Sequence, residues 1–578
     1  MDTFYTNERN AQILIYLMKA HNIKKVVVSP GTTNIAFVAS VQQDSYFEIF
    51  SSADERSAAY IACGLSEESG EPVALSCTGA TASRNYIPGL TEAFYRKLPV
   101  LAITSIPPTG RIGQNFPQMV DRSTTLNDIV NLSVQAYIVH DKEEEWACGV
   151  KINEALLELR HHGGGPVHIN LETTCDMSFN VRDLPPAPVI ERICDNDIFP
   201  KLDCNRVGVF VGAHKKWSKE LTNAIDAFCE AYNGVVICDQ TSNYQGKYKI
   251  FLSLAAGQDQ YYSPCRNMDV MIDIGNISGA YLRVSPNSVW RVNPDGVVRD
   301  THRKLRYVFE MEEITFFKKY VELAEKNMTM SYYKECRYEY DRIFAKIPEL
   351  PFSNIWIAKQ TYKLLPKGCI LHLGILNSLR AWNFFELSDV WGYANTGGFG
   401  IDGGVSSFVG ASLAYPEKLY FGVIGDLAFF YDMNSMGNRH IGKNLRLMVI
   451  NNGKGTEFKN YSHNASKFGD DANLYVAAAG HYGKQSKNLL KHYATDLGFE
   501  YMSASNKDEY LQRIKHFITP ELEERSMIFE IFTDSKDESD ALFAMNNIEI
   551  SQQSSDKRTP KQILREKGAH ALKRLIGK

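Results

Sequence analysis

The chain has 578 residues, too many for one hydrophobic core, and its 44% apolar and 22% charged content is that of an ordinary globular protein. A net charge of −4 gives no general attraction to nucleic acid or anionic lipid, so we expect no nucleic-acid partner. The eleven cysteines are scattered singly without a CxxC motif, which argues against a disulfide framework or a zinc ribbon and favours a reducing, cytoplasmic location. The first residues, MDTFYTNERNAQILIYLMKAHNI, have the pattern of an amphipathic helix and not of a signal peptide. No apolar run approaches the roughly 18 residues of a membrane span.

Along the chain, short apolar runs typical of buried strands alternate with helix-length segments. Examples are KKVVVSPG, PVALSCTG, RVGVFVGA, DVMIDIG, LYFGVIG and RLMVINN. Continuous apolar strands separated by helices indicate parallel sheets that are covered on both faces. Proline-containing stretches at 181–193 and 346–354 read as linkers. We therefore predict an α/β fold with three doubly wound parallel-sheet domains, at 1–185, 190–345 and 350–545, followed by a basic tail at 546–578.

In the first block, a helix is expected to begin beside two acids. Asp54 would cap this helix and Glu55 would lie in its first turn, where the helix dipole favours an acid by ~0.3–1 kcal/mol. The stretch CTGAT at 77–81 reads as a turn from a strand to a helix, with a flexible glycine at Gly79. Taken alone, both features have a purely structural explanation.

The middle block, about 190–345, contains Rossmann-like strand runs such as RVGVFVGA and DVMIDIG. It lacks the GxGxxG pattern with which a dinucleotide-binding turn approaches a pyrophosphate. We therefore expect no FAD.

In the last block, Asp426 follows the apolar run LYFGVI, and Asn451-Asn452 ends the run LRLMVI. We expect these runs to be neighbouring parallel strands joined by a helix over 432–443, so that both end at the same edge of a sheet. Open α/β sheets bind ligands at that edge. Carboxylate, amide and carbonyl oxygens suit Mg²⁺, and Gly425 would permit the close approach of a diphosphate. The alternative is a buried turn acid and a turn asparagine pair.

The tail from Ser551 carries eight Lys or Arg residues against two Asp or Glu. Its apolar residues fall mainly on one side of a helix that Pro560 would open. One interpretation is a helix docked on the protein's own body or on a partner subunit, because amphipathic helices usually face a core. The other is a basic helix that rests on an anionic membrane surface.

The spacing of the last motif resembles that of the thiamine diphosphate-binding motif. Gly425-Asp426 is followed, after 24 intervening residues, by Asn451-Asn452. The span 1–545 is similar to the three-domain plan of the pyruvate-oxidase-like thiamine diphosphate enzymes, with pyrimidine-binding, central Rossmann-like and diphosphate-binding domains. Within them it most resembles the family of 2-succinyl-5-enolpyruvyl-6-hydroxy-3-cyclohexene-1-carboxylate synthases. The matching stretches include VVVSPGTTN, DERSAAYIACGL, CTGATASRNYIPGLTEA, GILNSLR, GFGIDGGVSS and GDLAFFYDMNSM.

The resemblance implies roles for individual residues. Mg²⁺ would be held by Asp426, Asn452 and the carbonyl of Lys454. The acid of DERSAA, Glu55, would hydrogen-bond N1′ of the cofactor's aminopyrimidine as a catalytic group. Gln118, in NFPQMVD, would reach toward the reacting centre, with a surface loop amide as the alternative. The remaining expected cofactor contacts are Pro30, Gly31, Gly79 beneath the pyrimidine, Ile401 as the prop of the bent cofactor, Gly425 and Leu427.

The chain departs from the family where anionic substrates are bound. The family's Ser-Arg-Ser, Asp-Arg-Pro and Asn-Arg-Gly correspond here to Thr32-Thr33-Asn34, Ser105-Ile106-Pro107 and Asn395-Thr396-Gly397. Trp382 stands where a further arginine is expected, and Arg380 comes two residues too early. Each lost charged hydrogen bond would forfeit ~1.5–3 kcal/mol, so we expect a less anionic substrate.

Other polar residues near these turns are candidates for the substrate site. Arg84 and Arg111 would either restore one carboxylate contact or be solvated surface residues. His463 lies where substrate-covering loops occur, with a surface histidine as the alternative. The candidates for substrate contact are therefore Thr32, Thr33, Arg84 and His463. The pair His161-His162 does not match an active-site loop and reads as part of a connector.

These expectations combine into a thiamine diphosphate- and Mg²⁺-dependent carboligase. It would decarboxylate a small 2-oxo acid and transfer the acyl carbanion equivalent to an unknown acceptor. The alternatives are a simple 2-oxo acid decarboxylase and a non-catalytic protein that keeps the fold. The resemblance also implies a homodimer or a dimer of dimers, in which Glu55 of one chain and Asp426 of another belong to the same site.

Overall fold

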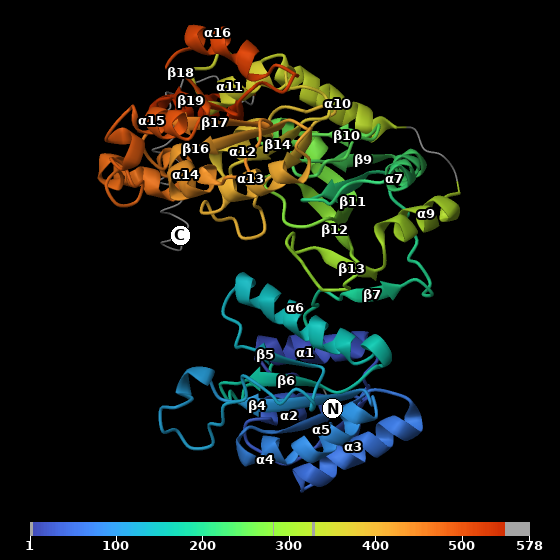
Figure 1. Ribbon diagram of the computed structural model, residues 1–578. Coiled ribbons are helices and arrows are strands. Elements are labelled where there is room, and N and C mark those ends of the chain that lie inside the picture. Colours follow the sequence, from blue (N-terminus) through green and yellow to red (C-terminus); the bar gives the residue numbers. More distant parts are fainter. Residues whose placement is uncertain (1–3, 281, 326–329, 550–578) are drawn as a thin grey trace. The chain divides into compact units, whose positions relative to one another are not determined.

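The structure is a computed structural model that describes residues 4–280, 282–325 and 330–549 (Figure 1). The chain forms two compact units. Unit 1 consists of Met1–Phe199 and Asp295–Glu310, and unit 2 of Pro200–Pro294 and Met311–Lys578. Most of the predicted tail, from residue 550 on, lies outside the described residues. The predicted domain boundaries stay a prediction.

Unit 1 contains a parallel sheet of six strands in the order β2-β1-β3-β4-β6-β5. Its strands are β1 (Lys25–Val28), β2 (Glu48–Ser51), β3 (Val73–Thr78), β4 (Val100–Ile106), β5 (Leu132–Ala136) and β6 (Val167–Glu172). The central strands β3, β4 and β6 are buried almost throughout, which explains their continuous apolar pattern.

Helices cover both faces of this sheet (Figure 1). One face packs against α1 (Arg9–Ala20), α2 (Ile35–Val41) and α6 (Lys142–Glu158). The other packs against α3 (Glu55–Ser69), α4 (Ala80–Asn85) and α5 (Ile87–Tyr95). Short 3₁₀ helices η1 (Thr109–Arg111) and η2 (His161–Gly163) lie in the connections, and β7 (Glu191–Cys194) pairs in parallel with β13 (Leu305–Glu310).

Unit 2 contains two further groups of parallel strands. The first has β10 (Lys249–Ile250), β9 (Gly234–Ile237), β8 (Val207–Val211), β11 (Asn267–Ile274) and β12 (Ser285–Val292) side by side in that order. The helical segments of this part are α7 (Lys219–Tyr232), α8 (Ser253–Ala256), η3 (Pro264–Arg266), α9 (Glu313–Leu323) and α10 (Ser331–Phe344).

The second sheet of unit 2 has six parallel strands in the order β15-β14-β16-β17-β19-β18. They are β14 (Ile370–Leu373), β15 (Trp391–Tyr393), β16 (Tyr420–Gly425), β17 (Leu445–Asn451), β18 (Glu500–Ala504) and β19 (Met527–Phe532). The accompanying α-helices are α11 (Asn354–Thr361), α12 (Asn377–Trp382), α13 (Gly404–Ala414), α14 (Asp426–Tyr431), α15 (Leu489–Asp496), α16 (Lys507–Phe517) and α17 (Ser535–Asn546). Four 3₁₀ segments complete it: η4 (Met433–Gly437), η5 (Thr456–Lys459), η6 (Asn464–Ala472) and η7 (Tyr482–Lys484).

The two six-stranded sheets share one topology. Numbered from its own first strand, each sheet runs in the order 2-1-3-4-6-5. In each, the chain reverses direction across the sheet between its first and third strands, so the carboxyl ends of β1 and β3, and of β14 and β16, mark a topological switch point. The predicted fold class, three parallel-sheet domains with interleaved helices, is confirmed.

The predicted crossover helix in unit 2 is misplaced. Strands β16 and β17 are parallel neighbours, as expected. The helix that joins them is α14, which begins at Asp426 itself and ends at Tyr431, before the predicted range 432–443. At Asp432 the backbone leaves the helical conformation, with φ −125° and ψ 16°, and the chain continues as the short η4. The Asp432 carboxylate accepts hydrogen bonds from the backbone and hydroxyl of Ser406.

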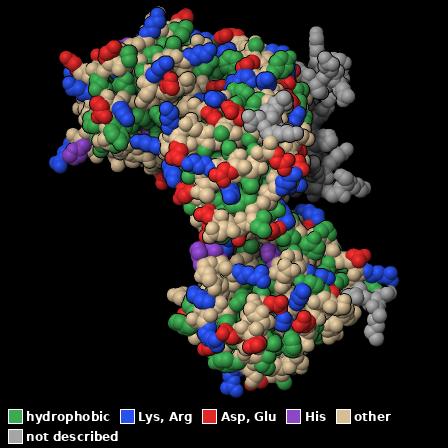
Figure 2. Space-filling model, turned by 90° about the vertical axis from the view of Figure 1, so that its right-hand side faces the viewer, with side chains coloured by type: hydrophobic (Ala, Val, Ile, Leu, Met, Phe, Trp, Pro, Cys, Tyr) green, Lys and Arg blue, Asp and Glu red, His purple; other side chains and the backbone are tan. Residues whose placement is uncertain are grey.

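The surface carries charges of both signs. On the face shown in Figure 2, Lys and Arg side chains are interspersed with Asp and Glu. Each helix among the described residues is too short or too polar to cross a membrane.

Candidate functional site

Asp426 is a buried carboxylate at the switch point of the second sheet in unit 2. It is 5% exposed and directly follows β16. Its Oδ2 accepts a hydrogen bond of 2.6 Å from the backbone N–H of Gly453, and its Oδ1 one of 2.9 Å from Leu427 N–H. Burial raises the pKa of Asp426 to about 6. Hydrogen bonds from backbone N–H groups lower this pKa and so offset part of the effect of burial. Across the part of the chain that the structure describes, no basic side chain pairs with this carboxylate.

The two asparagines at the end of β17, Asn451 and Asn452, have different hydrogen-bond partners. The Nδ2 of Asn451 donates to Glu530 Oε1 on β19 at 2.7 Å, so this side chain ties two strands together. The Oδ1 of Asn452 instead accepts a hydrogen bond of 2.7 Å from Thr456 Oγ1, within the loop that follows β17. The backbone N–H of Asn452 lies beside Asp426, and the part of its side chain in the ligand set stays a prediction.

The predicted third ligand is a backbone oxygen in the same loop. The side chain of Lys454 extends to Asn473, where its Nζ lies 3.4 Å from Oδ1, and the role of its carbonyl stays a prediction. Beside it, Gly453 adopts a φ of +74°, a conformation that favours glycine. A Cβ at Gly425 would meet no described atom within 4 Å, so the chain leaves open space at this point.

These residues fit a hydrated divalent cation. The set of a carboxylate, an amide oxygen and a carbonyl is the all-oxygen environment that Mg²⁺ takes, with further positions for phosphate and water. A buried carboxylate without a basic partner also needs a compensating charge, which a divalent cation supplies. The assignments of Gly425, Leu427 and the three ligands to cofactor and metal stay predictions.

Glu55 begins α3 in unit 1, as the sequence predicts. The side chain of Asp54 caps the helix by accepting from Arg56 N–H at 3.0 Å, and Glu55 is half-buried in the first turn. Its charge lies close enough to Tyr86 to contribute, after burial and the nearby Cys77, to a raised pKa of that phenol. The carboxylate is thus directed by a capped helix start, which suits a fixed hydrogen bond to a ligand.

The turns after β1 and β3 are packed against each other at the switch point of the first sheet. A Cβ on Gly31 would lie 2.6 Å from the Thr78 Cβ, and one on Gly79 would lie 2.9 Å from the Ser105 carbonyl, so both positions require glycine. Thr33 locks the turns together: its hydroxyl contacts Thr78 Oγ1 at 2.6 Å and donates to the Ser105 carbonyl at 2.8 Å. Pro30 and Thr32 are exposed beside this locked turn.

The other predicted residues of unit 1 lie in exposed positions. Gln118 is exposed in a turn with a φ of +62°. Arg84 is exposed and donates to the Asp121 carbonyl at 2.9 Å, and the Arg111 guanidinium lies 5.2 Å from the centre of the Phe116 ring. Their predicted roles at the substrate stay predictions, as does that of Ile401, which is half-buried in the loop before α13 in unit 2.

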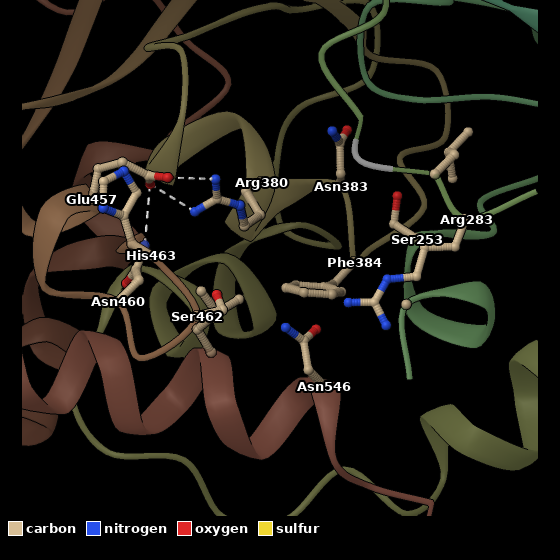
Figure 3. A pocket seen from close by; sticks show the side chains of 13 residues that line it. Ser253, Arg283, Arg380, Asn383, Phe384, Glu457, Asn460, Ser462, His463 and Asn546 are labelled. Carbon is tan, nitrogen blue, oxygen red and sulfur yellow. Dashed lines mark hydrogen bonds and ion pairs between the residues drawn. The ribbon is translucent and has the colours of Figure 1, made fainter. Parts of the chain in front are cut away.

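A pocket of about 390 Å³ lies beside the Asn452 loop in unit 2 (Figure 3). Arg380 on α12 forms a two-pronged ion pair with Glu457, at 2.8 and 3.0 Å, and Glu457 directly follows Thr456 in the chain. Arg283 enters from the other side and pairs with Asp259 at 2.8 Å. His463 lines the same pocket, and its Nδ1 accepts from Ala465 N–H at 3.0 Å.

Comparison with known proteins identifies the family. Residues 9–125 match the family described as "Thiamine pyrophosphate enzyme, N-terminal TPP binding domain". The chain is 32% identical over 557 residues to 2-succinyl-5-enolpyruvyl-6-hydroxy-3-cyclohexene-1-carboxylate synthase of Bacteroides fragilis, an alignment that covers 92% of this chain and 97% of that protein. The chain belongs to this synthase family. The synthase of Phocaeicola vulgatus is 31% identical with the same coverage, and that of Bacteroides thetaiotaomicron is 30% identical over 92% of this chain and 96% of its own length.

Membership of the synthase family confirms the resemblance seen in the sequence. The protein is a thiamine diphosphate-dependent enzyme with a thiamine diphosphate-binding amino-terminal part. The identity of about a third leaves room for changes in the residues that contact the substrate.

At the four positions where the resemblance implies arginine, this chain has buried, uncharged side chains. Thr33 is 7% exposed and Ile106 0% in unit 1, and Thr396 is 4% and Trp382 0% exposed in unit 2. An arginine at any of these places would bring a charge into the interior, which is costly without a partner. The replacements are therefore part of the packed structure around each turn and not exposed positions open to drift.

Two residues near Asp426 and Asn452, Thr456 and Glu538, were not predicted from the sequence. Thr456 orients Asn452, and the only sequence signal is its place four residues later in the loop. Glu538 on α17 is 8% exposed and accepts from Asn354 N–H at 3.1 Å. Burial raises its pKa to about 7, and the charge of Asp426 adds to the shift. Nothing in the sequence around Glu538 marks it, because its closeness to Asp426 arises only from tertiary packing.

Proposed function

We propose that the protein is a Mg²⁺- and thiamine diphosphate-dependent carboligase that decarboxylates a 2-oxo acid and transfers the acyl carbanion equivalent to an acceptor. The proposed donor and acceptor together carry fewer carboxylates than the 2-oxo diacid and isochorismate that the family pattern implies. One observation supports a substrate with fewer carboxylates. Uncharged residues are buried at the four positions where the resemblance implies arginine: Thr33, Ile106, Thr396 and Trp382.

The proposed work of the chain's own residues divides between its two units. In unit 2, Asp426, Asn452 and the Lys454 carbonyl would hold Mg²⁺, and the open space at Gly425 would admit a diphosphate. In unit 1, the Glu55 carboxylate would hold a hydrogen bond to N1′ of the aminopyrimidine. When bound, thiamine diphosphate supplies the electron sink for decarboxylation and for transfer of the acyl group.

The pocket of Figure 3 supports a substrate of low charge. Its two arginines already face carboxylates of the same chain, because Arg380 pairs with Glu457 and Arg283 with Asp259. A diacid entering this space would meet guanidinium groups whose charge is largely compensated. A neutral or singly charged molecule that hydrogen-bonds to Asn460, Ser462 or His463 suits the lining better.

The second candidate is simple decarboxylation, in which a proton is the acceptor. The half-buried His463 at the pocket favours this candidate, because a histidine can supply that proton. A non-catalytic role is disfavoured, because a buried Asp426 with a raised pKa destabilises a protein that makes no use of the charge.

Product analysis tests the proposal. Purified protein with thiamine diphosphate and Mg²⁺ is incubated with matched 2-oxo monoacids and 2-oxo diacids, each alone and with neutral or anionic acceptors, and products are identified by mass. We expect ligation products, formed with a higher kcat/KM from a monoacid than from the diacid of equal length. Aldehyde alone with every acceptor would refute the transferase. A preference for the diacid with isochorismate would refute the change of substrate.

A further inference from the structure

A cluster of histidine and carboxylate side chains lies in unit 1, away from the residues discussed above. His161 and His162 occupy η2, and both Nε2 atoms approach the carboxylate of Glu310, the last residue of β13. His161 Nε2 lies 2.8 Å from Oε2, and His162 Nε2 lies 3.1 Å from Oε1. The three ligand atoms lie within 4.8 Å of one another.

His161 also contacts a second carboxylate. Glu158, at the end of α6, receives the Nδ1–H of His161, with Oε1 and Oε2 at 3.0 and 2.9 Å. In the neutral ring this leaves the Nε2 lone pair facing Glu310. Both His161 Nε2 and Glu310 Oε2 are buried, and among the described residues neither has a hydrogen-bond partner of good geometry despite their closeness. A metal ion shared with His162 would give these two atoms a common partner.

We propose that His161, His162 and Glu310 form a binding site for one divalent transition-metal ion, with Zn²⁺ as its representative. Two imidazole nitrogens and one carboxylate suit zinc and its neighbours, whereas Mg²⁺ prefers oxygen alone. Glu158 takes the outer position, since a metal-bound histidine usually donates its other N–H to a carboxylate.

Binding one ion needs a rearrangement of the side chains. Zinc binds nitrogen and oxygen at about 2.0–2.1 Å, so tetrahedral ligand atoms lie about 3.3 Å apart, a few tenths of an ångström more than the two histidine–carboxylate spacings. The rings of His161 and His162 are stacked with centres 3.6 Å apart and planes inclined by 26°, so their lone pairs are nearly parallel and one ring must turn before both can bind the same ion. The side chain of His162 is 77% exposed and free to make the adjustment.

The neighbouring Arg192 bonds more closely to Glu158 than to the proposed ligand Glu310. Its Nη2 donates to Glu158 Oε1 at 2.9 Å and to the Gly296 carbonyl at 3.1 Å, while its Nε stands 3.4 Å from Glu310. Its stronger contacts thus hold the outer carboxylate. The cluster lines a pocket of about 480 Å³, which gives an ion and a fourth, water ligand access from solvent.

The position of the site indicates a structural role. η2 precedes β6 and so lies toward the amino ends of the strands of the first sheet, whereas the proposed cofactor contacts follow the carboxyl ends of β1 and β3. The site joins residues 148 positions apart in the chain, and Glu310 is the last residue of unit 1 before the chain enters unit 2. A metal ion here fastens the β7–β13 pair to the sheet of unit 1.

Zinc binding to untagged full-length protein tests the proposal. After treatment with a chelator, the protein is titrated with ZnCl₂ by calorimetry, and with CoCl₂ by absorption, which separates nitrogen and oxygen ligands from the protein's free thiols. We expect one Zn²⁺ per chain, a higher melting temperature with zinc, and a cobalt spectrum without a thiolate charge-transfer band.

Matched variants locate the site. His162→Ala removes an exposed ligand with little risk to folding and should weaken zinc binding at least tenfold, as should Glu310→Gln. His140→Ala is the control, because that side chain is 73% exposed and also pairs with one glutamate, Glu144. It should bind zinc like the unmodified protein. The proposal is wrong if the unmodified protein takes up no zinc, or if His162→Ala binds zinc as tightly as the unmodified protein and is stabilised by it equally.

Discussion

The hydroxyl of Thr456 donates a 2.7 Å hydrogen bond to Oδ1 of Asn452, the amide oxygen that we propose as a Mg²⁺ ligand. Thr456 is 3% exposed, so water does not compete for its hydroxyl. An amide oxygen has two lone pairs. The bond from Thr456 uses one of them, and it fixes the direction in which the second can bind a metal ion. Outer partners of this kind orient ligands at metal sites.

Replacing Thr456 by valine should therefore weaken Mg²⁺–thiamine diphosphate binding about tenfold, because the Asn452 amide would lose its fixed rotamer. Valine keeps the shape of the side chain and removes only the hydroxyl. Calorimetric titration with the cofactor and Mg²⁺ measures the change. Thr495→Val is the matched control, since that hydroxyl bonds only within the exposed end of α15. Equal affinity in both variants would contradict the orienting role.

The titration of Asp426 predicts how pH acts on the protein without its metal. Its pKa of about 6 lies above the ordinary 3.8, so the folded state holds this proton more tightly than the unfolded chain. The free energy of unfolding should thus fall as pH rises from about 4 to about 6, by up to roughly 3 kcal/mol. Mg²⁺ has the opposite dependence, because it binds the ionised form and should lose affinity below pH 6.

Asp426→Asn tests both statements. The variant should show a flatter dependence of unfolding free energy on pH between 4 and 6, measured with denaturant in the presence of a chelator. It should also bind Mg²⁺–thiamine diphosphate far more weakly at every pH. A Mg²⁺ affinity in the unmodified protein that is constant from pH 5 to pH 7 would speak against Asp426 as a ligand.

Glu55→Gln should leave cofactor affinity nearly unchanged and slow the exchange of the cofactor's C2 proton with deuterium severely. Glutamine keeps the size of the side chain but cannot serve as the proposed carboxylate at N1′. Exchange is followed by NMR after rapid acid quench. Glu68→Gln, on the exposed side of the same helix, is the control and should exchange at the unmodified rate. Exchange at that rate in Glu55→Gln would remove this residue from the proposed mechanism.

The proposed assembly places Glu55 of one chain and Asp426 of another in the same site. Mixing inactive Glu55→Gln with inactive Asp426→Ala should then restore activity, because a mixed dimer contains one site with both residues intact. Subunit exchange is verified independently by mass or by a fluorescent label. No recovery after verified exchange would mean that each site is built from one chain.

Much of the fold and part of the site follow from local patterns. The rule that parallel strands end at one edge predicts that Asp426 and the Asn451-Asn452 turn meet, and the Gly453 N–H to Asp426 bond shows that they do. The crossover helix begins earlier than predicted, at Asp426, and Asp432 beyond its end bonds to Ser406, a contact between distant segments. Helix periodicity carries no sign of such a bond.

The remaining parts of the site depend on tertiary packing. Glu538 comes close to Asp426 only when α17 packs beside α11. The burial of Trp382 likewise depends on neighbours from the middle block, whose Gln240 side chain donates to its carbonyl at 2.7 Å. The sequence shows that position 382 holds tryptophan where the resemblance implies arginine. Only the fold shows that this tryptophan side chain is fully buried.

The segment Asp295–Glu310 belongs to unit 1 although both of its chain neighbours belong to unit 2. A fragment that stops at Phe199 would carry β7 without β13, its partner in unit 1, and would expose the open edge of a strand. Neither unit can be cut out of the gene as one continuous stretch, so expression of residues 1–199 alone should yield aggregates unless residues 295–310 are spliced back. Evolution faces the same constraint, which ties the inheritance of the two units together.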